Sequence, residues 1–381
     1  MNKSLLALAL TTFCLGITEF GMMGMLDEVA AGIDVDIVTA GYLISSYSLG
    51  VAIGSPGLIL LRRWPMKKLL LLLVGIVCIG NLCAALSPSF ATLLCSRFVS
   101  GLPHGAFFGA AAIVAERLAP EGHKAQAVAI MVGGMTVANV VGVPLATFLS
   151  NALSWRLAFG VVSIGALVAW ICTRAWVPYL TPLPDTGLKG QFKFLSKPGP
   201  WLIYAGVFFG QASVYCWLSY IAPIMTDVTH FASADMTWIM VLVGLGMVVG
   251  NALTGKLSDR YPAALVTGVT AALLLVIMPA TYFLAAYKLP SAIFAFVAPA
   301  CLFGIGGPLQ YLIVRYAKGG EMLGGAGIQI SFNVSNAMSA AIGGLAIHHG
   351  LGLASPALIG IPFAAIGAAA LLVLYKRYRV Q

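Results

Sequence analysis

Twelve long apolar stretches follow one another along the chain, with little sequence between them. In the first half they run from about 4 to 26, 38 to 61, 69 to 87, 90 to 115, 125 to 149 and 155 to 177. In the second half they run from 200 to 225, 236 to 255, 263 to 287, 290 to 314, 322 to 347 and 353 to 375. Each can cross roughly 30 Å of hydrocarbon as a helix. This pattern predicts an all-α polytopic membrane protein with no room for a soluble catalytic domain.

The basic residues indicate how the helices are oriented. The net charge is +9, with 21 Lys and Arg residues. If the N-terminus is cytoplasmic, 18 of them fall on the cytoplasmic side, only Arg156 and Lys288 fall outside, and Arg97 lies within the membrane. This split satisfies the positive-inside rule, and an even number of helices returns the C-terminus to the cytoplasm. The basic charge therefore reflects membrane topology, and we expect no nucleic-acid partner.

An internal repeat divides the helices into two sets of six. A short motif returns after 196 residues, where Leu49-Gly50 and Gly54 recur as Leu245-Gly246 and Gly250. We predict two pseudo-symmetric six-helix bundles, 1–177 and 200–381, joined by a cytoplasmic linker, 178–199. Two such halves in parallel orientation imply a substrate site near the midplane between them, opened alternately to either side.

Two formal charges lie deep in the apolar stretches, Glu19 in the first and Arg97 in the fourth. A charge near the bilayer centre costs roughly 2.5 to 3.5 kcal/mol and so points to a function or a partner. Each lies about seven residues, or about 10 Å, from the outer end of its helix, so the two can meet.

Helical spacing places further residues on the same faces as these charges. Arg97 shares its face with Gly101, His104 and Phe108, and Glu19 shares its face with Thr12, Gly16 and Met23. We expect both faces to line one cavity and Glu19, Arg97 and His104 to handle protons. Two alternatives remain open: a static ion pair between Glu19 and Arg97, and a His104 that only donates a hydrogen bond in a polar cavity.

Polar side chains also occur at helical spacing in later apolar stretches. Because such groups are costly against lipid, they should face a cavity. The predicted substrate contacts are Thr12, Met23, Asn139, Gln211, Tyr215, Gln310, Gln329, Asn333 and Asn336. The alternative role for these side chains is hydrogen bonding between helices, worth about 0.6 kcal/mol each.

Several motifs resemble those of the major facilitator superfamily. GKLSDRYP at 255–262, with Gly255, Asp259 and Arg260, is similar to its loop signature, whereas the first-half copy RRWPMKK lacks the acidic residue. GGMTVANVVGVPLATF, with Gly142 and Pro144 at a kink, resembles the antiporter motif. RFVSGLPHGAFFG resembles the helix 4 motif of proton-coupled members, and LGITEFGMMGML and AKGGEMLGGAGIQISFN are similar to the arabinose efflux permease branch of the drug:proton antiporters.

The resemblance implies a proton-coupled antiporter that exports drugs or sugars from a bacterial inner membrane, as a monomer whose partners are the transported small molecule, protons and lipid. Its energy source is the proton gradient, and no cofactor is expected. The alternatives are an uptake symporter or facilitator, a channel and, more remotely, an intramembrane enzyme. The chain lacks GxSG and HExxH motifs, and its seven cysteines form no CxxC pair, so we expect neither an enzyme nor a metal site.

Overall fold

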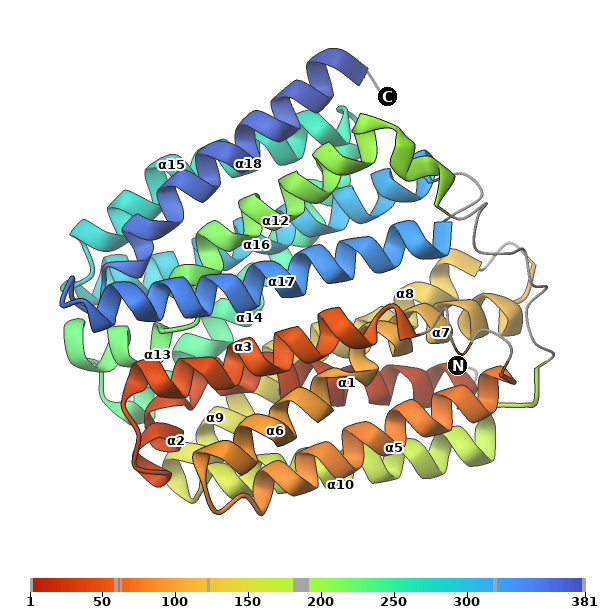
Figure 1. Cartoon of the computed structure of the whole chain (residues 1–381), viewed down its shortest axis with the longest axis horizontal. Coiled ribbons are helices and arrows are strands. Elements are labelled where there is room, and N and C mark those ends of the chain that lie inside the picture. The colour runs from red at the N-terminus through yellow and green to blue at the C-terminus, as the bar shows by residue number, and fades with distance from the viewer. Residues whose placement is uncertain are drawn as a thin grey trace.

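The computed structural model describes residues 3–57, 61, 64–121, 124–180, 192–317 and 321–378 (Figure 1). Within this part of the chain, 12 helices are long and apolar enough to cross a membrane. The first half contains α1 (Lys3–Gly24), α2 (Leu26–Gly32), α3 (Ile37–Gly54), α5 (Met66–Ala85), α6 (Phe90–Gly101), α7 (Pro103–Leu118), α8 (Lys124–Val137), η1 (Ala138–Gly142), α9 (Val143–Ala152) and α10 (Trp155–Trp176).

The second half repeats this arrangement. It contains η2 (Lys193–Ser196), α12 (Pro198–Leu218), α13 (Ile221–Pro223), η3 (Ile224–Val228), η4 (Ser233–Asp235), α14 (Met236–Ser258), α15 (Ala263–Phe283), α16 (Lys288–Tyr316), α17 (Glu321–His348) and α18 (Pro356–Tyr378). The predicted fold class, twelve transmembrane helices in two six-helix bundles, is confirmed.

Three spans are interrupted, and of these the sequence predicted a kink only in the fifth, at Gly142 and Pro144. The fourth span breaks at Leu102, because Pro103 has no N–H to continue the hydrogen-bonding ladder and begins α7 instead. The fifth span contains the π-helix η1 just before Pro144. The seventh span ends at Leu218 and continues as α13 and η3 after a turn. Leu102 keeps helical dihedral angles, so Arg97 and His104 still lie on one face, where both contact Tyr47.

Both ends of the described chain lie at one end of the bundle, and α2 and α13 lie at the opposite end (Figure 1). This arrangement agrees with an even number of spans. Residues 181–191 of the predicted linker lie outside the described residues, as do Arg62, Arg63, Lys318 and Arg379. The domain boundaries therefore remain predictions.

The repeated glycines mark two equivalent helix contacts. A Cβ added at Gly50 or Gly54 of α3 would clash with the carbonyl oxygens of Phe98 or Leu102. In the second half, a Cβ at Gly246 would clash with the carbonyl of Phe296, and Gly250 faces the carbonyl of Ala300 in the same way. Small residues let membrane helices approach this closely. The motif that recurs in the sequence thus produces the same packing in both halves.

Replacing Gly50 with Ala should destabilise the protein, because the obstacle is a backbone carbonyl that cannot rotate away. Overpacking of this kind costs about 1 to 3 kcal/mol. Gly160 of α10 is the matched control, since an added Cβ there meets no atom within 4 Å. Thermal unfolding in detergent should show a lower midpoint for Gly50→Ala and little change for Gly160→Ala; equal midpoints would contradict the close contact.

Candidate functional site

Arg97 is held by the N-terminal half and is fully buried, with 0% of its surface exposed. The side chain of Ser89 caps the start of α6, and Arg97 follows two turns later. Its Nη1 donates to the carbonyl of Thr18 at 2.6 Å, and its Nε donates to the carbonyl of Leu43 at 3.4 Å. The guanidinium carbon lies 4.4 Å from the ring centroid of Tyr47. Arg97 therefore joins α6 to α1 and α3 through two carbonyls and an aromatic face.

Glu19 is 1% exposed, and neither of its carboxylate oxygens has a hydrogen-bond partner. No ion pair joins it to Arg97 among the described residues, so the predicted direct contact, and the static ion pair as an alternative, are wrong in this conformation. Matching depth places two side chains in one layer but does not turn them toward each other. The ionisable neighbour of Glu19 is His104, whose Nε2 lies 3.8 Å from Oε2.

Tyr47 connects Arg97 to His104, and the sequence analysis missed it. Its hydroxyl lies 2.7 Å from Nδ1 of His104, and the imidazole ring stacks on Phe108 with centroids 5.1 Å apart. If Tyr47 donates to Nδ1, the neutral imidazole carries its hydrogen on Nε2, the atom nearest Glu19. A tyrosine between two serines in an apolar helix was the available signal. The buried centre is thus a series running from Arg97 through Tyr47 and His104 to Glu19.

A series of aromatic contacts connects the buried centre to helices of the second half. Phe20, next to Glu19, lies 5.9 Å from Phe303 of α16, and Phe303 lies 6.3 Å from Phe332 of α17. Phe332 in turn packs edge-on against Tyr215 of α12 at 5.4 Å. The proton-site candidate and a predicted substrate residue therefore share one region between the halves.

Several predicted substrate residues bury polar atoms that lack a partner. An unmet buried donor or acceptor costs about 1 to 3 kcal/mol, so a solute or water that satisfied it would bind favourably. The atoms are Oδ1 of Asn139, Oε1 of Gln211, Oη of Tyr215, Oδ1 of Asn333, and both Oδ1 and Nδ2 of Asn336. Together with Glu19 they give a mixed set of amide, phenol and carboxyl groups.

Other predicted residues are used differently. Thr12 donates to the carbonyl of Met131 at 2.6 Å, and Gly16 packs against Ala138, so this part of α1 contacts the fifth span instead of a cavity. The Thr12 hydroxyl is thus occupied by packing between helices. Met23 is completely buried, and Gln310 and Gln329 are half-buried.

The predicted conformational residues lie at two helix ends. Gly142 ends η1 and packs on Ile17, with Pro144 directly after it in α9. Asn139 of η1 presents its carbonyl to Gly244 of α14, so this π-helix contacts the other half. Gly255 lies in the last turn of α14, and Asp259 and Arg260 follow the end of that helix and are exposed. Neither charge forms an ion pair within the described residues.

A polar contact joins the halves at the α2 end, and no sequence pattern indicated it. The hydroxyl of Thr226 lies 3.2 Å from Oδ2 of Asp27 and 3.0 Å from Oδ1 of Asp227. One hydroxyl hydrogen can serve only one of these carboxylates. Burial, together with the charges of Glu28 and Asp227, raises the pKa of Asp27 to about 7. The hydrogen bond from Thr226 by itself favours the charged carboxylate, but burial and the two acidic neighbours outweigh it.

Replacing Asp27 with Asn should flatten part of the pH dependence of stability. The folded protein keeps the Asp27 proton that the unfolded chain loses near pH 4, so stability falls as pH rises from about 4 to about 7. Unfolding midpoints measured across this range should fall less in Asp27→Asn than in the parent. Asp34→Asn, an exposed acid in the same region, is the control and should retain the parental slope.

Comparison with known proteins agrees with this architecture. Residues 8–324 match the family model described as Major Facilitator Superfamily. The chain is 44% identical over 385 residues to AraJ of Escherichia coli strain K12, covering 100% of this chain and 97% of that protein. It is 36% identical to the inner membrane transport protein YdhP of Escherichia coli O157:H7, again over 100% and 97% of the two chains.

A third relative and a solved structure extend the comparison. The chain is 28% identical to a chloramphenicol resistance protein of Streptomyces lividans, covering 93% of this chain and 92% of that protein. A bacterial homologue of the human lysosomal transporter Spinster, solved in an inward-facing and unoccupied conformation, superposes with a TM-score of 0.74 at 20% identity, covering 98% and 96% of the two chains. At that identity the match establishes the fold alone.

Proposed function

The chain belongs to the major facilitator superfamily, and from this membership and the buried centre around Glu19 we propose that it is a proton-coupled antiporter that exports small molecules. The family consists of transporters, so the protein is not an enzyme. Alternating access of the two halves would expose the centre first to one side of the membrane and then to the other.

One observation carries the proposal: a buried carboxyl group without a hydrogen bond, at the junction of the two halves. A carboxylate in this position is costly, and either a proton or a polar solute would remove the cost. Once a proton has neutralised the carboxylate, a bound solute no longer stabilises it, and a bound solute likewise removes the need for the proton. Proton binding to Glu19 from outside and substrate binding from inside would therefore alternate, which couples export to proton entry.

His104, held in place by Tyr47, is the side chain that can hydrogen-bond to the carboxyl group of Glu19. His104 Nε2 lies 3.8 Å from Oε2 of Glu19, which is too long for a hydrogen bond. A small movement of α1 toward α7 would bring the two atoms within hydrogen-bonding distance. Arg97 stays fixed by two carbonyls and contributes its charge from a distance. We propose that α1 moves against α7 within the first half during alternating access, and that this changes the distance from Glu19 to His104 and so the affinity of Glu19 for the proton.

The groups facing the centre favour a neutral or weakly charged solute with both polar and apolar surface. Unpartnered amide atoms of Asn333 and Asn336 would supply hydrogen bonds, and Phe303 and Phe332 would supply apolar surface. Drugs and sugars both have this chemistry. The chloramphenicol resistance relative supports efflux of a drug of this kind.

We propose that the protein lies in a bacterial inner membrane with both termini in the cytoplasm. The distribution of Lys and Arg supports this orientation, and the name of the relative YdhP supports the location. In that orientation the contact between Asp27 and Thr226 joins the two halves at the outer end.

Proteoliposomes with an imposed pH gradient test this function. An expressing strain is first screened for growth against toxic compounds, including chloramphenicol, to identify a substrate. Addition of that substrate should then drive proton movement across the vesicle membrane. Equilibration without proton movement would identify a facilitator, and movement of substrate and proton in the same direction would identify a symporter; either result would overturn the proposal.

A further inference from the structure

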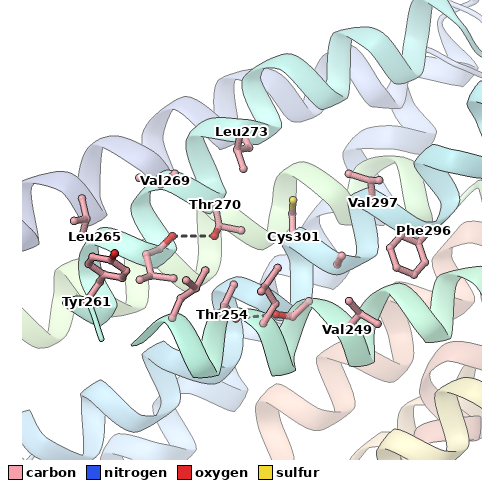
Figure 2. Close-up of a pocket in the computed structure, with 15 residues that line it drawn as sticks. Val249, Thr254, Tyr261, Leu265, Val269, Thr270, Leu273, Phe296, Val297 and Cys301 are labelled. Atoms are coloured by element: carbon pink, nitrogen blue, oxygen red, sulfur yellow. Dashed lines mark hydrogen bonds between the residues drawn. The ribbon is translucent and has the colours of Figure 1, made fainter. Parts of the chain in front are cut away.

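A cavity of about 440 Å³ opens on the outside of the second half, between α14, α15 and α16 (Figure 2). None of the central polar residues lines it. Leu253 of α14 and Val269 and Leu273 of α15 form its walls and are 49 to 56% exposed. On a chain that spans a membrane, side chains exposed at this depth face lipid. We call this cavity the lateral groove.

The lateral groove is confined to one leaflet. Its wall on α15 runs from Leu265 to Leu273, about 12 Å at 1.5 Å per residue, which is under half of the roughly 30 Å of hydrocarbon. Tyr261, in the loop between α14 and α15, marks the end nearest the aqueous phase. A ligand entering from that side would lie along the helices with its other end at the bilayer midplane.

The interior of the lateral groove offers no unmet hydrogen-bonding group. Two of its polar side chains are Thr254 and Thr270, and each donates to a carbonyl of its own helix, Gly250 at 2.9 Å and Val266 at 2.8 Å (Figure 2). Cys301 at its base behaves as a small apolar residue. A polar solute would lose its hydration here without compensation, so the interior suits a hydrocarbon chain.

The loop end of the groove is basic. Backbone hydrogen bonds continue from Gly255 to Asp259 and from Leu257 to Tyr261, so helical spacing holds through this turn. By that spacing Lys256 and Arg260, three and seven residues after the groove residue Leu253, fall on the same side of the helix as Leu253. Asp259, six residues after Leu253, points away from that side. Both basic side chains are exposed, and neither forms an ion pair within the described residues.

We propose that the lateral groove binds one acyl chain of an anionic phospholipid, whose phosphate lies between Lys256 and Arg260. Basic sites beside membrane helices bind such head groups. The bound lipid would support α14, whose Gly244 packs against the first half at Asn139. The groove thus places a lipid against a helix that contacts both halves.

Native mass spectrometry of the purified full chain tests the proposal, with dioleoyl phosphatidylglycerol and dioleoyl phosphatidylcholine as the probes. The parent should retain one phosphatidylglycerol about tenfold more tightly than phosphatidylcholine. Lys256→Gln combined with Arg260→Gln should remove this preference. Lys376→Gln combined with Arg377→Gln, two basic residues in the last turn of α18, is the matched control and should keep it.

A second pair of variants tests the hydrocarbon part of the groove. Val269→Trp should fill it and reduce retention of both lipids, whereas Ile164→Trp, on an exposed position of α10, should not. Equal retention by these two variants, or a preference for phosphatidylglycerol that survives loss of both basic residues, would overturn the proposal.

Cys301 gives a measurement that does not depend on a bulky substitution. In a variant that keeps only this cysteine, phosphatidylglycerol should slow its reaction with a maleimide. The protection should disappear with Lys256→Gln and Arg260→Gln. Unchanged labelling in the presence of lipid would show that the groove is empty.

Discussion

Replacing Glu19 with Gln is expected to abolish proton-driven export while the protein remains folded in the membrane. Gln has the shape of a protonated Glu, so it keeps the packing next to Phe20 but cannot release or take up a proton. Uphill export in proteoliposomes should fall to the protein-free level. Downhill exchange of labelled for unlabelled substrate should continue, because it needs no net proton transfer.

The matched control for this variant is Glu116→Gln. Glu116 also lies on a membrane helix, at the end of α7, but it is exposed. Its replacement removes the same charge at the surface and should leave uphill export unchanged. Retained uphill export in Glu19→Gln, or an equal loss in both variants, would remove Glu19 from the coupling mechanism.

Replacing Arg97 with Lys should also reduce transport strongly, even though the positive charge is kept. Lys has no planar fork to reach the carbonyls of Thr18 and Leu43 together while lying on the ring of Tyr47. Hydrogen bonds to a charged group are worth about 1.5 to 3 kcal/mol each, so losing one should reduce transport by at least about tenfold. Initial transport rates, normalised to membrane-inserted protein, measure this loss.

Arg156→Lys provides the comparison for Arg97→Lys. Arg156 also donates to a carbonyl, that of Ser87 at 3.1 Å, and lies 4.1 Å from the ring of Trp155, but it is only half-buried. Solvent can replace its contacts, so its substitution should change transport little. If both variants transport equally well, the fixed position of Arg97 has no role in transport.

The membrane architecture could be predicted from the sequence because its causes are local. Apolar length determines the spans, and the paired glycines at Gly50 and Gly246 determine which helices approach closely. Basic residues in the loops determine the expected orientation. None of these inferences requires knowing how the helices are rotated about their own axes.

The arrangement of the site depended on that rotation. Depth along α1 and α6 placed Glu19 and Arg97 in one layer, but Tyr47 from a third helix occupies the face of the guanidinium. Arg97 and His104 do share a face, as helical spacing predicted, since both contact Tyr47. Helical spacing likewise placed Thr12 with Glu19, although it faces the fifth span. Such contacts depend on how neighbouring helices pack, so the residue spacing within one helix does not predict them.

The most direct test of the mechanism is proton release on substrate binding. Purified protein in weakly buffered detergent solution, with a pH indicator, is mixed with the compound identified by the growth screen, and binding is measured in parallel by calorimetry. The parent should release protons as it binds, whereas Glu19→Gln should bind the compound and release none. Equal proton release from both proteins would contradict the exchange of proton for substrate at Glu19.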